Sequence, residues 1–383
     1  MSLKIRQFIL ILGDIALLYI SLFLALSIRN QEIISEKVWS DHWPIFSIAF
    51  VIWLSVFYIT GAYSINNVKN DIKSIMDTAR AMGVNILLAV SVFYLLPQTQ
   101  LTPKTILLLS GIIYFGLLII WWQIFRKYYY LIRDADVIHI HDVFVWYLPF
   151  RFLFWRKPVI TTFHGWEGIF PVPMKNKLWR KLGVLLSTKT IAVGKYLEKY
   201  YGFSADIIIY GGVHVPRQVF SKENILLYVG RLDYDTGFPL LLQSLKQQPW
   251  SGKVIFCGDG VLREQAESIG EVTGFRNPIP FLKKAKIVFA GGYLSALEAF
   301  AYKCIVLAAY NNPLKRDYFS LSPFGHIINV VKNKKDLSKK ILFLKKNTKF
   351  TKDKIEEGFS FAKKQSWQSI TKIYLDLYKS VEK

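Results

Sequence analysis

The sequence predicts two kinds of structure in one chain, an α-helical membrane module followed by α/β domains of the Rossmann type. The mean hydropathy is +0.27 although the formal net charge is +22, a combination that fits a membrane protein with a basic cytoplasmic part. Apolar segments near the ~20 residues needed to cross a bilayer fall within the first 130 residues. From Asp136 onward, short apolar runs alternate with helical segments, which is typical of a doubly wound parallel sheet.

Four apolar segments predict membrane spans. They cover residues 8–28, 43–62, 82–96 and 105–125, of which the third is the shortest. The loops expected on one side hold eight basic residues, and those on the other side hold three. We therefore expect a multi-pass protein of the inner (cytoplasmic) membrane with both chain ends, and thus its C-terminal domain, in the cytoplasm. Asp14 lies inside the first span, and we interpret it as facing neighbouring helices rather than as functional.

Most of the positive charge follows the spans. Residues 1–130 contain ten Lys and Arg and six Asp and Glu, a net +4, so the remaining 253 residues carry +18. This charge favours an anionic membrane surface, a nucleic acid or a phosphorylated substrate as partner. Because no recognition motif accompanies it, we expect no nucleic acid. Cys257 and Cys304 lie in strand-like runs without paired Cys/His spacing, so we predict neither disulfides nor a zinc site.

The α/β part begins with three strand-like runs. They read D-V-I-H-I-H-D, P-V-I-T-T-F-H-G and T-I-A-V-G. His139 and His141 share one face of the first run, and we interpret both as structural. The segments between the runs, F-V-W-Y-L-P-F-R-F-L-F-W-R-K and M-K-N-K-L-W-R-K-L-G, are basic, aromatic and amphipathic. This composition indicates elements that lie on a membrane surface, although the second fits an ordinary covering helix equally well.

A strand–glycine turn–helix pattern stands at residues 286–303. The apolar run K-I-V-F-A predicts a buried strand, and Gly291 and Gly292 let the backbone turn and approach a ligand closely. Ser295 is expected to cap the helix that follows, whose apolar residues share one face (Leu294, Leu297, Phe300 and Ala301). Such a junction directs free N–H groups and the positive end of the helix dipole at a ligand, for which a diphosphate is suitable.

Glu298 lies one turn into that helix, and two interpretations of it stay open. Its carboxylate can accept hydrogen bonds from the two hydroxyls of a ribose. Alternatively, Ser295-x-x-Glu298 is a capping box, in which Glu298 only bonds its own helix terminus. The rest of the chain favours the ligand.

The order of motifs in the second part resembles the family-4 retaining glycosyltransferases of the GT-B type. The chain reads T-F-H-G, I-I-Y-G-G-V, Y-V-G-R-L-D-Y-D-T-G, F-C-G-D-G-V-L-R-E and Y-L-S-A-L-E-A-F-A, and it closes with S-F-A-K-K-Q-S-W-Q-S-I-T-K-I-Y-L-D-L-Y, across about 240 residues. The spans resemble the membrane region of polyprenyl-phosphate sugar phosphotransferases through G-D-I-A-L-L and F-Y-I-T-G-A-Y. Because that family's catalytic region is missing, the second resemblance implies a membrane module alone.

Together the resemblances imply four parts. They are a four-helix transmembrane module (1–130), a shortened acceptor-side Rossmann-like domain (131–222), a nucleotide-sugar-binding Rossmann-like domain (223–365) and a C-terminal crossing helix (366–383). The implied fold class is an α-helical membrane module plus α/β, with GT-B-like Rossmann domains of which the first is truncated.

The resemblance also implies site residues. Arg231 would bind the donor diphosphate, since a guanidinium fork can hold two phosphate oxygens, and Glu298 would bind the donor ribose. His164 would lie near the transferred sugar, unless it is a satisfied loop histidine. These three form the implied catalytic set. The implied substrate-binding residues are Gly165, Gly230, Gly258, Gly291, Gly292, Ser295 and Lys315.

The chain departs from the family pattern at three points. Thr236 replaces the lysine of the G-R-L-x-x-x-K-G loop, and we hypothesise that Lys315 or Arg316 supplies the missing charge. Ala290 stands where the family has a Glu, so sugar recognition is expected to differ. Only about 85 residues separate the fourth span from the G-G-V loop, against ~150–180 for a complete domain. We interpret D-Y-D at residues 233–235 as part of its loop rather than as a metal site.

We therefore predict a membrane-anchored, retaining, hexosyltransferase-like enzyme of cell-surface polysaccharide or glycolipid synthesis. It would move a sugar from a nucleotide-sugar to a lipid-linked or membrane-proximal acceptor, with no metal and no cofactor besides the nucleotide-sugar substrate. The alternative is a degenerate or half-enzyme subunit that binds a nucleotide and needs a partner subunit. The short first domain, Ala290 and Thr236 favour that alternative.

Overall fold

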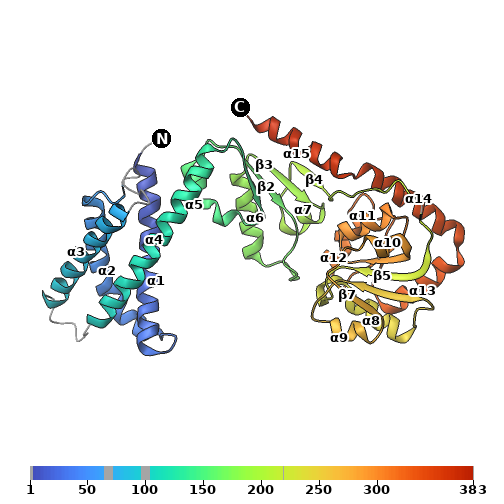
Figure 1. Cartoon of the computed structure of the whole chain (residues 1–383), viewed down its shortest axis with the longest axis horizontal. Helices are drawn as coiled ribbons and strands as arrows, with labels where there is room; N and C mark the ends of the chain where they lie inside the picture. The colour runs from blue at the N-terminus through green and yellow to red at the C-terminus, as the bar shows by residue number, and fades with distance from the viewer. Residues whose placement is uncertain (1–2, 64–71, 96–103, 219, 383) are drawn as a thin grey trace. The chain divides into compact units, whose positions relative to one another are not determined.

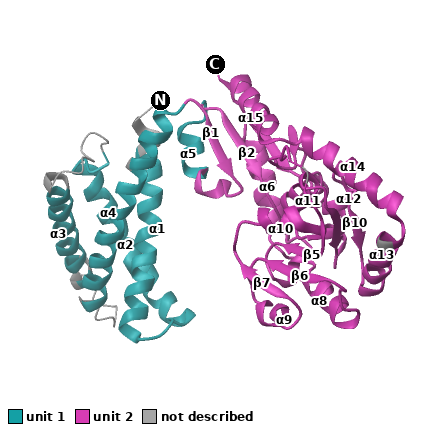
Figure 2. Cartoon of the chain, turned by 45° about the vertical axis from the view of Figure 1, so that its right-hand side comes forward, with its two compact units in different colours: residues 1–135, 148–156 teal, residues 136–147, 157–383 magenta. Residues whose placement is uncertain are grey.

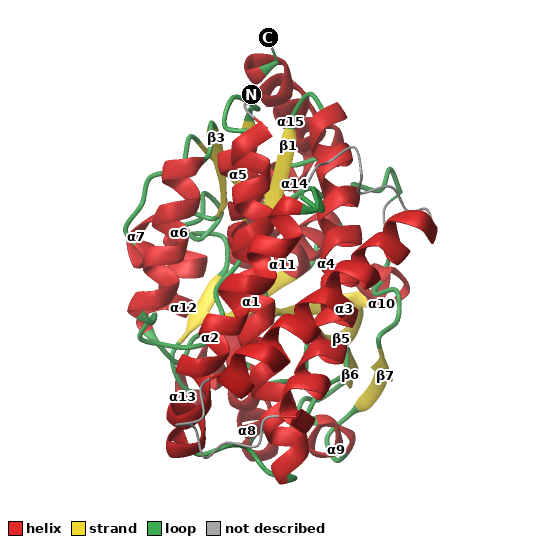
Figure 3. Cartoon of the chain, turned by 90° about the vertical axis from the view of Figure 1, so that its left-hand side faces the viewer, coloured by secondary structure: helices red, strands yellow, loops and turns green. Residues whose placement is uncertain are grey.

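The chain forms two compact units, which Figure 2 colours separately. This computed structural model describes residues 3–63, 72–95, 104–218 and 220–382. Unit 1 comprises residues 1–135 and 148–156, and unit 2 comprises residues 136–147 and 157–383. The described part of unit 1 is helical, and all described strands belong to unit 2 (Figures 1 and 3).

Long helices build unit 1. They are α1 (Leu3–Asn30), α2 (Glu36–Ile59), α3 (Ile72–Leu95) and α4 (Lys104–Asp134), followed by the short α5 (Leu148–Leu153). Within the described residues, α1, α2 and α4 are long and apolar enough to cross a membrane, and α3 is not among them. The first, second and fourth predicted spans fall in these three helices. The third does not qualify, so the four-span module is not confirmed.

Buried polar groups in unit 1 are shared between neighbouring helices. Asp14 is fully buried, and its Oδ1 accepts a hydrogen bond from Trp122 Nε1 of α4 at 3.2 Å. Trp53 Nε1 donates to the carbonyl of Asn85 at 2.9 Å, and the Asn85 amide donates back to the carbonyl of Trp53 at 3.3 Å. Such pairing satisfies groups that would be costly in hydrocarbon. Asp14 thus faces a neighbouring helix, as interpreted from the sequence.

Unit 2 contains two parallel sheets. The first has the strand order β1-β2-β3-β4, and the second has the order β10-β9-β8-β5-β6-β7. The first sheet and its helices are β1 (Ile138–His141), η1 (Phe144–Trp146), β2 (Val159–Phe163), α6 (Met174–Leu186), β3 (Lys189–Val193), α7 (Tyr196–Tyr201) and β4 (Ile207–Ile209). The pairings are parallel throughout the described strands, which confirms the predicted α/β class.

The second sheet lies among a larger set of elements. They are β5 (Glu223–Val229), η2 (Tyr234–Thr236), α8 (Phe238–Gln247), β6 (Lys253–Cys257), α9 (Arg263–Glu267), β7 (Glu271–Gly274), α10 (Ile279–Lys284), β8 (Ala285–Ala290), α11 (Tyr293–Ala301), β9 (Ile305–Ala309), α12 (Pro313–Ser320), β10 (Asn329–Val331), α13 (Lys334–Lys346), α14 (Thr348–Lys364) and α15 (Trp367–Val381). Strand β8 is the buried strand expected from the apolar run, since Ile287, Val288 and Phe289 are at most 2% exposed.

Helix α11 buries most of the predicted apolar face. Leu297, Phe300 and Ala301 are buried in the core, but Leu294 is 50% exposed. Leu294 lies in the first turn of the helix, where its side chain rests against Gly211 instead of against the sheet. The assignment of Leu294 to the buried face was therefore wrong.

The chain crosses between the two sheets twice, and the two crossings lie side by side. One is the linker from β4 to β5, and the other is the turn from α14 to α15. Val213 N–H donates to the carbonyl of Gln365 at 2.8 Å and joins them. Helix α15 then packs on the first sheet, where Leu377 and Val381 contact its isoleucines (Ile160, Ile191 and Ile209).

Candidate functional site

The centre of the second sheet is a switch point in strand order. Strand β5 lies between β6 and β8, so the chain winds in opposite directions on its two sides. Val229 at the end of β5 pairs with Cys257 of β6 and with Ala290 of β8, so the three strands end level with one another. In open α/β sheets, ligands bind outside the carboxyl ends of the strands at such a point.

A glycine follows each of these three strand ends. Gly230, Gly258 and Gly291, all predicted to bind substrate, therefore form a row along the carboxyl edge. Gly258 has φ +159°, and a Cβ built on it would lie 1.8 Å from the carbonyl oxygen of Gly230. No side chain fits there, so the edge between β5 and β6 is formed by main chain that a ligand can approach closely.

The N-terminus of α11 differs from the prediction. Gly292, not Ser295, is the N-cap residue, and Ser295 lies three residues into the helix. Ser295 Oγ accepts the Gly292 N–H at 3.2 Å, and the Tyr318 hydroxyl accepts the Tyr293 N–H at 2.9 Å. The expectation that Ser295 is the N-cap is thus wrong, and so is the alternative of a Ser295–Glu298 capping box. Two of the N–H groups expected to face a diphosphate are already bonded to side chains.

Because Glu298 does not cap the helix, its carboxylate can bind a ligand. It is half-buried, and among the described residues its carboxylate has no hydrogen-bond or ion-pair partner. Burial raises the pKa of the carboxyl above its ordinary value. A half-buried carboxylate without a protein partner has an unmet capacity for hydrogen bonds, which the two hydroxyls of a ribose could satisfy.

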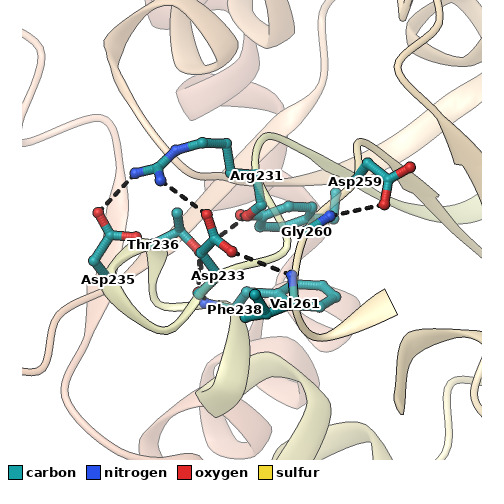
Figure 4. Close-up of polar contacts among 9 residues, drawn as sticks. Arg231, Asp233, Asp235, Thr236, Phe238, Asp259, Gly260 and Val261 are labelled. Carbon is teal, nitrogen blue, oxygen red and sulfur yellow. Dashed lines mark hydrogen bonds and ion pairs between the residues drawn. The ribbon is translucent and has the colours of Figure 1, made fainter. Parts of the chain in front are cut away.

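Arg231 follows Gly230 directly, and its guanidinium is held by its own loop. Figure 4 shows the fork between two carboxylates, with Nη1 at 2.8 Å from Asp233 Oδ2 and Nη2 at 2.7 Å from Asp235 Oδ2. The other oxygen of Asp233 accepts the Val261 N–H at 3.3 Å and so joins the loops after β5 and β6. D-Y-D therefore serves the G-R-L loop, as interpreted from the sequence.

Thr236 has a local structural role. Its hydroxyl donates to the carbonyl of Arg231 at 3.1 Å or of Asp233 at 2.8 Å, and it accepts the Phe238 N–H at 3.4 Å (Figure 4). These bonds fix the short η2 turn before Gly237, which has φ +79°. Thr236 closes the loop and contributes no charge to it.

Lys315 supplies a charge at the same edge. It is 6% exposed, and its ammonium donates to the carbonyl of Gly291 at 2.9 Å. Burial lowers the pKa of Lys315 to about 8, while nearby Asp235 acts to raise it and Arg231 to lower it. Arg316 instead pairs with Asp317 at 2.8 Å. Of the two candidates for the missing charge, Lys315 is the one that reaches the switch point.

His164 and Gly165 lie at the carboxyl edge of the first sheet, in the loop after β2. They line a cavity of about 540 Å³ together with Trp166, Trp179 and Arg180. The Arg180 guanidinium donates to the carbonyl of Gly165 and to Glu167, while its Nη1 is buried without a partner among the described residues. The cavity thus combines aromatic walls with polar groups, an arrangement that suits a sugar or another polar acceptor.

Three histidines form a row beside this cavity. His141 Nδ1 and His164 Nε2 are 2.7 Å apart, so the two imidazoles share one proton. The rings of His139 and His141 stack with centroids 4.4 Å apart, and His139 Nδ1 is 2.6 Å from the Tyr378 hydroxyl. The Asp142 carboxylate accepts the main-chain N–H of His164 at 2.8 Å. His139 holds α15 to the sheet, as a structural residue does, whereas His141 contacts a candidate catalytic residue.

The His139 environment predicts a pH dependence of stability. Burial, with smaller contributions from His141 and His164, lowers the pKa of His139 from its ordinary 6.5 to about 4. Between these values the unfolded chain binds a proton that the folded chain does not, so stability falls as the pH drops from 6.5 toward 4. We expect His139→Gln to flatten this fall, measured as the thermal midpoint of the full chain in detergent. His326→Gln, at an exposed histidine, is the control. Equal slopes in wild type and His139→Gln would contradict this expectation.

The loops of the two sheets meet at this edge. A Cβ built on Gly168, in the loop after β2, would lie 3.6 Å from Asp235 Oδ2 of the Arg231 loop. A Cβ on Gly194, at the end of β3, would lie 2.7 Å from the Tyr293 hydroxyl at the start of α11. The structure therefore brings the His164 loop and the Arg231 loop to one place, as the prediction of a shared site requires.

Sequence reasoning missed three contributors to the site. Tyr318 of α12 stacks on Tyr293 with ring centroids 3.9 Å apart and occupies a helix N–H. Arg180 and Asp142 support the His164 loop from α6 and from the end of β1. A signal existed only for Asp142, because it follows a strand of the parallel sheet and so stands at the same carboxyl edge.

Two parallel Rossmann-like sheets whose carboxyl-edge loops meet, with a terminal helix that returns to the first sheet, define the GT-B fold of glycosyltransferases. Comparison with solved structures agrees. The chain is similar to S. aureus TarM, with a TM-score of 0.51 and 18% identity over 66% of this chain and 57% of TarM. It is also similar to Anabaena Alr3699/HepE in complex with UDP, with a TM-score of 0.53 and 17% identity over 66% of this chain and 81% of that one. This chain thus spans less than two thirds of TarM.

Two sequence comparisons point the same way. The Glycosyltransferase Family 4 description matches residues 97–215, which include the first sheet. MJ1178 of Methanocaldococcus jannaschii, an uncharacterized glycosyltransferase, is 26% identical over 247 residues, covering 57% of this chain and 69% of that protein. With the fold, these likenesses support a glycosyltransferase.

Proposed function

We propose that this chain is a membrane-anchored glycosyltransferase that moves a sugar from a nucleotide-sugar donor to a lipid-linked or membrane-proximal acceptor with retention. The observation that carries the proposal is the switch point. There, three glycines and Arg231 follow the strand ends, and Lys315 lies on the neighbouring helix α12. Glu298, whose carboxylate has no partner among the described residues, lies on α11. Alr3699/HepE, which has the same fold, has been solved with UDP and with UDP-glucose.

The proposed chemistry rests on electrostatic stabilisation. When the bond between sugar and nucleotide breaks, negative charge accumulates on the departing diphosphate. Lys315 is fixed by the Gly291 carbonyl and can face that charge as it stands. Arg231 lies at the adjoining strand end and can face it once its guanidinium leaves Asp233 or Asp235. Glu298 would hold the ribose, and His164, held by His141, would donate a hydrogen bond to the transferred sugar or its phosphate. No metal is part of this proposal.

When the donor binds, the Arg231 guanidinium has to leave Asp233 or Asp235 for the diphosphate. This exchange of partners can be tested. Asp235→Asn removes one of the carboxylates that hold the guanidinium, so we expect the donor to bind about tenfold more tightly, on the order of one charge-assisted hydrogen bond. The measurement is the Kd for UDP by equilibrium dialysis on the full chain. Glu267→Gln, which removes a carboxylate from Arg263 instead, is the matched control. Weaker binding in Asp235→Asn would contradict the proposed partner exchange.

The acceptor part of the proposal rests on the first sheet and the spans. The candidate membrane helices belong to the same chain, and α6 exposes large apolar side chains, with Met174 at 66%, Leu178 at 59% and Leu185 at 78%. Lys175 and Lys181 are exposed on the same helix. Such a helix suits the interface of an anionic membrane, where a lipid-linked acceptor would reach the His164 cavity. Cell-surface polysaccharide or glycolipid synthesis is the setting that we infer.

Two observations favour a second function. Arg231 is neutralised by two carboxylates of its own loop, and among the described residues the first sheet has four strands against six in the second. Both features suit a nucleotide-binding half-enzyme that needs a partner subunit.

One experiment separates the two functions. Membranes that carry the full chain are incubated with UDP- or GDP-sugars and lipid extract, and release of the nucleoside diphosphate is measured. We expect release by the wild type and about tenfold less by Glu298→Gln, since a hydrogen bond to a charged group is worth roughly 1.5–3 kcal/mol. Nucleotide binding without release would favour the half-enzyme. If Glu298→Gln releases the nucleoside diphosphate as fast as the wild type, the proposed role of Glu298 in the site is wrong.

A further inference from the structure

A second cavity lies where the chain crosses between the sheets of unit 2. It has a volume of about 600 Å³ and is bounded by the linker before β5, the C-terminal end of α11 and the helix α14. Four basic residues line it, namely Arg217, Lys222, Lys303 and Lys363, and its lining contains no Asp or Glu. Three aromatic rings, Phe220, Tyr302 and Phe359, form apolar walls beside them. This combination of charge and rings has no part in the proposed transfer reaction.

The positive charge in this cavity is only partly neutralised. Lys303 Nζ pairs with Glu356 at 2.7 Å, and Lys222 Nζ donates to the carbonyl of Leu282 at 2.8 Å. Arg217 and Lys363 have neither an ion pair nor a hydrogen bond with other side chains in the described part of the chain. Several cations gathered around one cavity, with no carboxylate among the described lining residues, repel one another, and a bound anion would relieve that repulsion.

Two ammonium groups flank one aromatic ring in this cavity. Lys303 Nζ and Lys363 Nζ each lie 4.6 Å from the centroid of Phe359. The Phe359 ring thus attracts both ammonium groups, although Lys303 follows α11 and Lys363 lies on α14. Phe220 and Tyr302, with centroids 5.7 Å apart, form the wall beside them. The ligand that matches these features is an organic anion, with a phosphate for the cations and an apolar or ring-shaped part for the walls.

The backbone at Lys303 supports a use for its side chain. Lys303 has φ +54°, and it follows Tyr302, the C-cap residue of α11, at the position where helices often place a glycine. A lysine is strained there, and strain of this kind is found at functional positions. The helix dipole does not explain an anion site, because the C-terminal end of a helix repels anions. The lysines must therefore provide the attraction.

We propose that this cavity is a second anion-binding site, for an organic phosphate, separate from the donor site at the switch point. The phosphate would bind Arg217 on the linker, Lys303 after α11 and Lys363 on α14. The ligand would thereby join the linker to the helix whose other end carries the glycine turn of the donor site, roughly 14 Å away at 1.5 Å per residue. Its source is either a phospholipid head group or a soluble phosphorylated metabolite.

The test uses the full chain in a zwitterionic detergent, with the thermal unfolding midpoint as readout, because a ligand that binds only the folded state raises it. The probes are phenyl phosphate for a soluble organic phosphate and dihexanoylphosphatidylglycerol for a lipid head group. The variant is Lys303→Gly with Lys363→Gln. Glycine suits the positive φ at 303, so the fold is retained. Lys339→Gln, at an exposed lysine of α13 outside the cavity, is the control for the loss of a surface charge.

We expect at least one probe to raise the midpoint of the wild type, of Lys339→Gln and of Arg231→Ala. The double variant should need at least tenfold more of that probe for a half-maximal rise, since it lacks two of the charged contacts. The probe that acts identifies the source of the ligand. An equal response of the double variant, a response abolished by Arg231→Ala, or no response to either probe would overturn the second site. None of these results bears on donor turnover, so the proposed function is judged separately.

Discussion

Arg231→Ala is expected to lower kcat/KM for the nucleotide-sugar by about a hundredfold, the range seen when one donor that stabilises a developing charge is removed. Arg231 stands at the end of β5, directly after the glycine of the switch point, and its fork is the bidentate group on that loop. The measurement is the initial rate of nucleoside diphosphate release in membranes that carry the full chain, at several donor concentrations.

A neighbouring arginine provides the control for that result. Arg263 also pairs with two carboxylates, Asp259 at 2.7 Å and Glu267 at 2.8 Å, and its side chain is 44% exposed against 59% for Arg231. Arg263→Ala therefore removes a similarly paired charge from the start of α9, the helix after β6. If both variants lose activity equally, the effect reflects net charge, and the role of Arg231 in the site is contradicted.

Lys315→Met is expected to cost a similar factor, about a hundredfold in kcat/KM, with little loss of stability. The methionine keeps the apolar stem, and removal of a buried charge offsets the loss of the hydrogen bond to Gly291. Retained thermal stability together with lost activity would distinguish a role in the site from a role in folding. Lost stability without a change in kcat/KM would contradict the account.

Lys315 also predicts a pH profile. Its pKa in the folded chain is about 8, below the ordinary 10.5 of lysine, so the ammonium loses its charge as the pH rises through 8. We expect kcat/KM, which reports the free enzyme, to fall above that pH in the wild type and to lose this fall in Lys315→Met. The stability of the fold is expected to change with pH in the opposite direction to kcat/KM. The unfolded chain binds more protons between pH 8 and 10.5, so the cost of burying the charge is relieved as the pH rises through that window.

The parts of the fold that depend on local pattern could be predicted from the sequence. Continuous apolar runs such as the one before Gly291 predicted parallel strands, and the glycines after them predicted the turns at the carboxyl edge. The order of β5, β6 and β8 in the sheet follows from the doubly wound class. The α/β class and the GT-B fold are thus confirmed, and the place of the site at the switch point stays a prediction.

The wrong details depend on contacts between distant residues. Ser295 looked like a cap because serine favours that position, but the helix begins earlier, where Tyr318 from α12 accepts the Tyr293 N–H. His141 contacts His164 because β1 and β2 are neighbours in register, which periodicity alone does not show.

The charge state of the Arg231 loop could have been foreseen. Asp233 and Asp235 lie two and four residues along from Arg231, within reach in a tight turn. With one arginine against two carboxylates, the loop has a formal charge of −1 before a donor arrives, so Lys315 supplies the positive charge that the loop lacks. The roles of these residues in catalysis stay predictions.

The most direct measurement of the central claim is the Kd for UDP, by equilibrium dialysis on the purified full chain and three variants. If the switch point between β5 and β8 holds the diphosphate, Arg231→Ala and Lys315→Met weaken binding about tenfold or more, while Asp235→Asn strengthens it. Weaker UDP binding after loss of a cation, together with stronger binding after loss of the carboxylate beside it, is expected only if the diphosphate binds next to these groups. The same Kd in all four proteins would contradict the account and place the nucleotide, if it binds, elsewhere on the chain.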